Sequence, residues 1–238
     1  ATRIAALRNN DIDIISRLGP EQADSIKDQE GVQLISYPKD RVYYIAFNNM
    51  TTGVGTPIEE QKVRQAMSYA IDYQAIIDNI FNGKAERAAG FVVPGNLGYD
   101  PSIEPYPYDP EKAKELLAEA GYQDGFEIDM AGPSDTYINF EQVLQAVVGY
   151  WGEIGIGVNL EFMESGKYWN LEAKRQLRPL FGDSWSSSTG EAFPRLIGSV
   201  GGKDASYAAW FDQKLVDLVE EVKLTPDQNE RAKVYTEI

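Results

Sequence analysis

The stretch PIEEQKVRQAMSYAIDYQAIIDNI, residues 57–80, does most to decide the fold of this sequence. Its apolar side chains recur at helical spacing, which predicts a helix with one face packed on a core. Thr56-Pro57 starts this helix, and Asp72 starts a second one directly after it. The stretch therefore predicts two helices that cover another layer of the protein.

A second stretch, YPYDPEKAKELLAEAGY at residues 106–122, predicts a complete helix with both of its ends. Asp109 is a favoured N-cap residue, Pro110 suits the first turn, and Gly121 ends the helix. The Ala and Leu residues between them form one apolar stripe. This helix also has a face that must be buried.

Helical and strand patterns alternate along the rest of the chain. Further helices are predicted at residues 4–15, 20–26, 140–155, 167–175, 192–197 and 215–222, with a last one after 225–226. Strands are predicted at residues 32–37, 42–47, 126–130, 156–162 and 179–181, and a turn at 132–133. Alternation of this kind predicts an α/β domain in which helices flank a mixed sheet.

Composition excludes several classes of function. The net charge of -15 and the pI near 4.4 argue against nucleic acid and against an anionic membrane surface. The chain has no Cys and no His, which removes thiol nucleophiles, the usual zinc sites and the usual general base near neutral pH. No metal or other cofactor is expected, and catalysis would have to rest on carboxylates, Lys, Tyr or Ser.

The two ends and one internal break suggest how the chain is organised. The sequence begins at Ala1 and ends at Ile238 inside stretches that read as helices, so we expect a fragment of a longer protein. Asn48-Asn49 and the glycine-containing turn after them interrupt the pattern before the helix at Thr56. We therefore expect a domain boundary after residue 48.

A Ser-rich loop at residues 183–191 is the first candidate site. It follows a predicted strand and precedes a predicted helix, the position in which ligand sites of α/β sheets are often found. Ser186, Ser188 and Thr189 offer hydroxyl groups, and Trp185 offers an apolar surface. The alternative is a solvated loop in which Ser188 or Thr189 only caps the next helix.

A second strand-to-helix loop, at residues 132–139, is the other candidate. Tyr137 and Asn139 could hold a polar ligand. The alternative is that Asn139 is a helix N-cap and Tyr137 a contact at the rim. Residues alone leave these two interpretations equal.

A catalytic site is not predicted. The carboxylates of Glu59, Glu60, Asp109 and Glu111 lie in first helical turns, where they complement the helix dipole. No set of nucleophile, base and orienting group can be assembled. A carboxylate-based hydrolase such as a glycosidase stays open as an alternative, because it needs two carboxyl groups facing across a cleft.

Many short motifs, in this order, resemble the family 5 solute-binding proteins of bacterial ABC importers, which include oligopeptide, dipeptide and glutathione receptors. The motifs are LRNNDID (7–13), IAFNN (45–49), KVRQA (62–66), AID (70–72), FNG (81–83), VP (93–94), YDPEKA (108–113), LLAEAG (116–121), IGIGV (154–158), and SY (206–207) with Trp210. No single motif is diagnostic, but their number and order are specific.

The resemblance implies a type II periplasmic-binding-protein-like fold. Residues 1–48 would be the C-terminal part of the split first lobe, and residues 49–238 the second large lobe, truncated at its C-terminal end. The protein would be a periplasmic or membrane-anchored extracellular monomer that delivers solute to ABC permease subunits. A receptor-like domain used for signalling or chaperone contacts is a further alternative.

The resemblance also allows binding residues to be transferred position by position. Dipeptide receptors of this family hold the ligand ammonium with a carboxylate at the position of Ser188, with Glu191 a few residues on. They hold the peptide carboxylate with an Arg in the loop equivalent to 132–139, where this chain has Asp135 and Thr136. Because both charged anchors are missing, glutathione-like peptides, opines or other polar metabolites are as well supported as dipeptides. Ligand contacts are expected from Asp135, Tyr137, Asn139, Trp185, Ser186, Ser188, Thr189 and Glu191.

Overall fold

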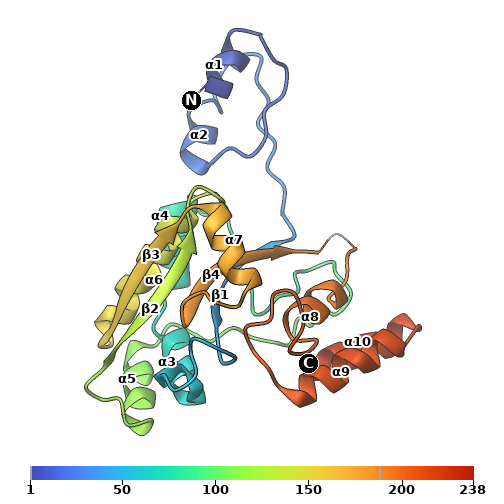
Figure 1. Ribbon diagram of the computed structural model, residues 1–238. Helices are drawn as coiled ribbons and strands as arrows, with labels where there is room; N and C mark the ends of the chain where they lie inside the picture. The colour runs from blue at the N-terminus through green and yellow to red at the C-terminus, as the bar shows by residue number, and fades with distance from the viewer. Residues whose placement is uncertain (1, 188) are drawn as a thin grey trace.

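A four-stranded mixed sheet forms the centre of the computed structural model, which describes residues 2–187 and 189–238 (Figure 1). Its strands are β1 (Arg41–Phe47), β2 (Phe126–Pro133), β3 (Ile156–Met163) and β4 (Leu180–Ser186), in the order β1-β4-β2-β3. β2 is parallel to β3 and β4, and β1 is antiparallel to β4 at the edge. The carboxyl ends of β2, β3 and β4 therefore meet at one edge of the sheet.

Helices cover both faces of this sheet, as the sequence predicts. Ile128 and Met130 of β2 point to one face, into a core shared with α3 (Gln61–Tyr69), α5 (Pro110–Glu119) and α6 (Phe140–Glu153). Ala131 of the same strand points to the other face, because side chains alternate along a strand. There it contacts the cluster that includes Tyr168 of α7 (Ser165–Ala173).

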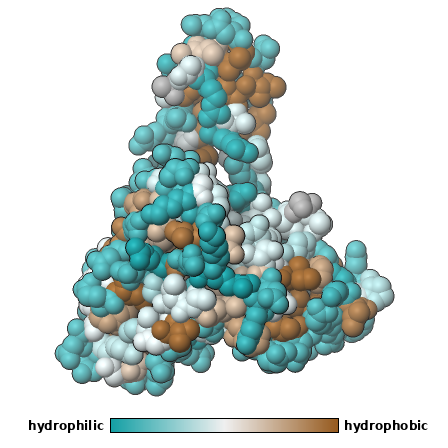
Figure 2. Space-filling model, viewed as in Figure 1, coloured by the Kyte–Doolittle hydropathy of each residue, from teal (hydrophilic) through white to brown (hydrophobic). Residues whose placement is uncertain are grey.

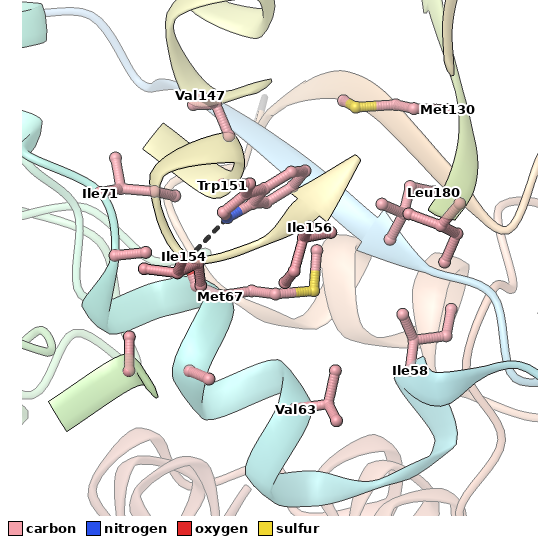
Figure 3. Close-up of a cluster of buried hydrophobic side chains, with 14 of the residues drawn as sticks. Ile58, Val63, Met67, Ile71, Met130, Val147, Trp151, Ile154, Ile156 and Leu180 are labelled. Atoms are coloured by element: carbon pink, nitrogen blue, oxygen red, sulfur yellow. Dashed lines mark hydrogen bonds between the residues drawn. The ribbon is translucent and has the colours of Figure 1, made fainter. Parts of the chain in front are cut away.

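Trp151 lies at the centre of the larger core (Figure 3). Only 1% of this side chain is exposed, and its indole N–H donates a hydrogen bond of 2.8 Å to the carbonyl oxygen of Met67. α6 is thereby fixed to α3 by packing and by one buried polar contact. α4 (Tyr73–Phe81) and the short 3₁₀ helix η1 (Pro57–Glu59) pack beside them.

Two smaller units lie outside the sheet. The C-terminal helices α8 (Phe193–Ser199), α9 (Gln213–Leu224) and α10 (Gln228–Glu237) form an apolar cluster of their own. α1 (Thr2–Arg8) and α2 (Pro20–Asp24) project from the body beyond an extended segment (Figure 1). None of the helices in the described ranges is both long and apolar enough to span a lipid bilayer.

Several predicted boundaries are wrong. Residues 32–37 form no strand in the described chain; Ile35 and Tyr37 are 68% and 66% exposed, so this β-rich pattern has no sheet to bury it. The first helix stops at Arg8, since Asn10 has a positive φ of 60°. Gly132-Pro133 continues β2 instead of forming a turn.

β4 is also longer than predicted. It extends to Ser186, because β1 provides an antiparallel partner as far as the pair Arg41 and Ser186. The segment 183–186, expected in a loop, is therefore strand. The division into lobes after residue 48 stays a prediction; β1, which precedes that point, lies in the same sheet as β4.

Replacement of Gly125 should destabilise the start of β2. Gly125 has a φ of 75°, and an added Cβ would overlap the carbonyl oxygen of Gly155, which accepts a hydrogen bond from the N–H of Phe126. A positive φ alone costs about 1–2 kcal/mol. We expect Gly125→Ala to lower the free energy of unfolding by about 2–4 kcal/mol in a urea titration, a size typical of strained backbone. Gly149→Ala, where an added Cβ meets nothing within 4 Å, is the control, and equal costs would contradict the prediction.

Candidate ligand-binding site

A cavity of about 320 Å³ lies at the carboxyl ends of β2 and β4, beside α7. It is lined by Tyr137, Trp169, Glu172, Ala173, Asp183, Ser184, Trp185, Ser206 and Tyr207. This is the edge at which α/β sheets usually bind ligands. The cavity is large enough for a small solute or for one part of a larger one.

Tyr137 and Trp185, from the two candidate loops, line this same cavity. Trp185 packs edge-on against Tyr207, with ring centroids 4.8 Å apart and an interplanar angle of 79°. Tyr137 meets Trp169 at 6.4 Å and 63°. The structure therefore brings one residue from each candidate loop to the same cavity, while the part that these residues play in binding stays a prediction.

Asp183 is buried at the floor of this site, with 3% of the residue exposed. Its Oδ1 accepts hydrogen bonds from the hydroxyl of Tyr137 at 2.8 Å and from the N–H of Ser184 at 2.6 Å. Its Oδ2 accepts a hydrogen bond from the hydroxyl of Tyr44 at 3.0 Å. Burial raises the pKa of Asp183 in spite of these donors, which lower it. Both carboxylate oxygens already have protein partners.

Glu172 of α7 is the second carboxyl group of the cavity and is 8% exposed. Burial, and then the charge of Asp183, raises the pKa of Glu172 to about 8. Its Oε1 is buried and accepts no hydrogen bond from a donor group of the residues that the structure describes, while a side-chain hydrogen bond with Asp183 contributes to the raised pKa. The indole N–H of Trp185 is likewise buried without a partner in that part of the chain. Both atoms belong to residues of the cavity wall.

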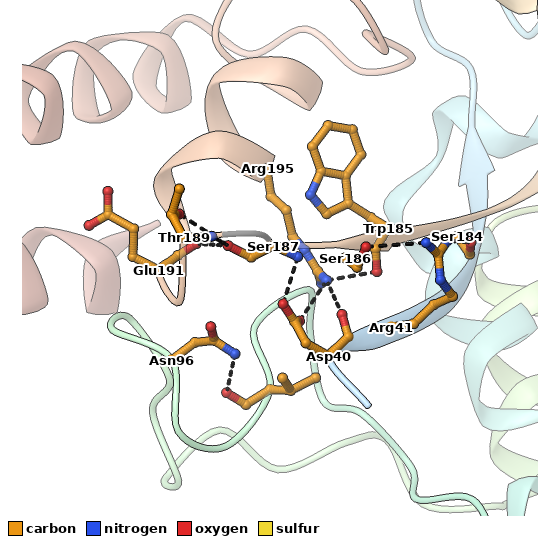
Figure 4. Close-up of polar contacts among 11 residues, drawn as sticks. Asp40, Arg41, Asn96, Ser184, Trp185, Ser186, Ser187, Thr189, Glu191 and Arg195 are labelled. Carbon is orange, nitrogen blue, oxygen red and sulfur yellow. Dashed lines mark hydrogen bonds and ion pairs between the residues drawn. The ribbon is translucent and has the colours of Figure 1, made fainter. Parts of the chain in front are cut away.

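Two arginines hold the end of β4 in place (Figure 4). Arg195, 2% exposed, donates to the carbonyl oxygen of Trp185 at 2.7 Å and to the Asp40 carboxylate at 3.2 Å. Arg41 donates to the hydroxyls of Ser184 and Ser186. Its guanidinium also lies 5.4 Å from the ring centre of Tyr137. These contacts fix the backbone that carries Trp185.

Among the residues that the structure describes, the other predicted site residues do not line this cavity. Asp135 is exposed, and its backbone N–H donates to Glu141 at 2.9 Å. Asn139 starts α6 without a side-chain cap; its amide donates to the carbonyl oxygen of Ile80 at 2.8 Å.

In the Ser-rich segment, the described residues after Trp185 do not line the cavity either. Ser186 is exposed and accepts from Arg41 at 3.2 Å, and Thr189 is exposed and donates from its backbone to Ser187 at 3.3 Å. Glu191 pairs with Arg231 of α10 at 2.8 Å. The predicted residue Ser188 lies outside the described residues. Residues 186–187 and 189–191 therefore join the helices to the sheet more than they line the cavity.

Sequence reasoning missed Glu172 as a site residue. The sequence feature that could have identified Glu172 is helical spacing. Glu172 lies one turn after Tyr168, so the two side chains share one face of α7. Asp183 carries a related signal, because it is an acidic residue inside an apolar strand run. Such buried acids often mark functional sites.

A polar and aromatic cavity at the carboxyl edge of a mixed sheet is the arrangement typical of α/β domains that bind small ligands. Residues 1–207 match the family described as bacterial extracellular solute-binding proteins, family 5 Middle. The chain belongs to this family, and its periplasmic-binding-protein-like fold confirms the predicted fold class.

Individual relatives agree with that assignment. The chain is 28% identical to the dipeptide-binding protein of Escherichia coli K12 over 242 residues, covering 99% of this chain and 44% of the relative. It is 33% identical over 246 residues to the glutathione-binding protein GsiB of Salmonella typhimurium, covering 99% and 47%. The structure of AgaA from A. tumefaciens R10 with agropinic acid superposes with a TM-score of 0.82 at 28% identity, covering 98% and 48%. The chain thus spans less than half the length of these relatives.

Proposed function

We propose that this chain is the ligand-binding lobe of an extracytoplasmic receptor that delivers a peptide or a related polar metabolite to an ABC permease. One observation carries the proposal: the cavity wall presents a buried indole N–H and a buried carboxyl oxygen, both without partners in the described chain. Buried polar groups are normally hydrogen-bonded, so a polar solute is the natural partner. Relatives named for binding dipeptides and glutathione, and one solved with an opine-like acid, support the solute class.

The mechanism we propose is closure of two lobes over the solute. Contacts made only in the closed state shift the open–closed equilibrium, and the permease reads closure. In this scheme residues 1–48 belong to the split first lobe and residues 49–238 to the second. The receptor would act as a monomer, either in the periplasm or anchored outside the cell. The family description, which calls these proteins extracellular, supports this location.

We propose binding without catalysis. The hydrolase alternative needs two carboxyl groups, and Glu172 and Asp183 are the candidates, because both line the cavity together with Trp185. Asp183 accepts three hydrogen bonds from hydroxyl and amide donors, which hold its carboxyl group in place and make it a weaker nucleophile. Aryl glycosides incubated with the complete protein test this choice. Stoichiometric retention without release of the aryl alcohol supports binding, and catalytic release supports the hydrolase.

Solute carried by the complete gene product is the direct test. Mass spectrometry of the purified protein, before and after denaturation, should release a peptide or small polar metabolite. Absence of any retained solute, together with no binding from a library of peptides and metabolites, would contradict the proposal.

Trp185→Phe should weaken binding of that solute roughly tenfold in calorimetry. The change keeps an aromatic ring but removes the N–H donor, and one hydrogen bond contributes about 1 kcal/mol or more. Trp210→Phe is the matched control, because Trp210 packs under Arg64 at 4.3 Å and does not line the cavity. Equal affinities of wild type and Trp185→Phe would show that the indole N–H does not bind the solute.

A further inference from the structure

We propose that the cavity receives a cationic group of the solute, an ammonium or a guanidinium, between the Glu172–Asp183 pair and the surrounding aromatic rings. This inference rests on the proposed function and specifies the chemistry that the site selects. It assigns a recognition role to Glu172 and Asp183, two side chains of the cavity lining that were not among the predicted binding residues.

The charge of the wall is the first argument. Glu172 and Asp183 are its ionisable acids, and none of the described residues that line the cavity is Lys or Arg. The two residues are 8% and 3% exposed. Buried carboxylates are normally paired with a cation, since an unpaired one is costly to desolvate. A cation supplied by the ligand would meet this requirement.

The unpartnered oxygen is the second argument. Asp183 accepts hydrogen bonds from Tyr44, Tyr137 and the Ser184 N–H, whereas Oε1 of Glu172 accepts none from a donor group of the described chain. The direct contact for a ligand N–H therefore falls to Glu172, with the charge of Asp183 behind it. The Trp185 N–H can serve a neighbouring acceptor of the same solute, such as a peptide carbonyl.

The aromatic walls are the third argument. Tyr137, Trp169, Trp185 and Tyr207 surround the pair, and the faces of such rings attract cations. Arg41, which lies outside the lining, already places its guanidinium 5.4 Å from the ring centre of Tyr137. Carboxylates combined with aromatic faces are a recurrent setting for alkylammonium and guanidinium groups.

Proton occupancy agrees with this assignment. The titratable groups that interact with Glu172 are Asp183 on β4, Tyr44 on β1 and Tyr168 on α7. Burial raises the pKa of both carboxyl groups, so the pair holds a proton in place of a counter-cation. A bound ammonium or guanidinium would take over that role.

Three synthetic tripeptides test the proposal by calorimetry on the complete gene product. Ala-Arg-Ala carries a guanidinium, Ala-citrulline-Ala replaces it with a neutral urea of the same shape, and N-acetyl-Ala-citrulline-Ala also lacks the α-ammonium. We expect Ala-Arg-Ala to bind at least about tenfold more tightly than the acetylated citrulline peptide, the range of a charge-assisted contact. Ala-citrulline-Ala keeps the α-ammonium but lacks the guanidinium, so its affinity shows which of the two cations occupies the site.

Glu172→Gln tests whether the preference arises in this cavity. The substitution keeps the shape of the side chain and removes its charge. It should reduce the ratio between the affinities for Ala-Arg-Ala and for the acetylated citrulline peptide to about one. Glu161→Gln is the control, because Glu161 is a partly exposed carboxylate on β3 that pairs with Lys167 at 3.0 Å and does not line the cavity. It should leave the ratio of the two affinities unchanged.

The outcomes separate this inference from the proposed function. Equal binding of the three peptides, or a preference that survives in Glu172→Gln, overturns the cation site. Tight binding of a neutral or anionic solute, with no binding of Ala-Arg-Ala, overturns it while leaving a solute receptor. A folded complete protein that binds no solute at all overturns both.

Discussion

Between about pH 4.5 and pH 8, the protein should lose stability steadily as the pH rises, and Glu172→Gln should flatten this loss. The pKa of Glu172 is raised from the ordinary 4.5 to about 8 in the fold, by burial first and by Asp183 second. In this window the folded state holds a proton that the unfolded state has released, so folding becomes less favourable as the pH increases. The stabilising effect is complete below the unfolded pKa and is lost as the pH passes through the folded pKa.

The size of this effect should be a few kcal/mol, because one unit of pKa corresponds to about 1.4 kcal/mol. Urea titrations at half-unit intervals from pH 4.5 to 8.5 measure it. At pH 8, Glu172→Gln should be more stable than wild type. The control is Glu161→Gln: Arg178 first, and then Lys167, lower the pKa of Glu161, so its contribution changes only in more acidic solution. A wild-type curve that is flat across the window, or an equal slope in Glu172→Gln, would show that Glu172 titrates normally.

Trp151→Ala should lower the free energy of unfolding by about 3–5 kcal/mol, the usual cost of removing a large aromatic side chain from a core. Trp151 is 1% exposed and lies among buried residues of α3, α6 and β3 (Figure 3). Its removal also leaves the carbonyl oxygen of Met67 without the indole donor. Few single changes in this chain combine both costs.

Trp151→Phe separates the two costs. It retains most of the packing and removes the hydrogen bond, so we expect a loss of about 1–3 kcal/mol. Trp210→Phe should change stability by less than about 1 kcal/mol, because Trp210 is only half-buried. Chemical denaturation followed by circular dichroism compares the three variants. A loss below about 1 kcal/mol for Trp151→Ala would refute the central position of this residue.

The helices were the most predictable part of the fold. Asp72 and Asp109 accept hydrogen bonds from Ala75 and Lys112 at 2.9 Å, as expected of N-caps, because capping is a local property of the sequence. Strand assignment depended on partners elsewhere in the chain. Residues 32–37 have β-forming side chains but no strand beside them, whereas residues 183–186 are strand because β1 lies beside them.

The candidate site was predictable only in part. Strand-to-helix position led to Tyr137 and Trp185, and the common carboxyl edge of the parallel strands brings them together. Glu172 reaches the cavity wall only when α7 packs on the sheet. Whether a donor group reaches its Oε1 also depends on the tertiary structure and cannot be read from the sequence. Glu191 illustrates the converse, since Arg231, forty residues away, determines where its carboxylate lies.

Asn49 connects the sheet to one wall of the cavity. Its backbone N–H donates to Ala209, its side-chain oxygen accepts from the N–H of Phe211, and its amide donates to the carbonyl oxygen of Phe211. The segment bearing Ser206 and Tyr207 is thus tied at its base to the end of β1. Substitutions at the tip of this segment can therefore change the lining of the cavity while a single asparagine keeps the segment in register with the sheet.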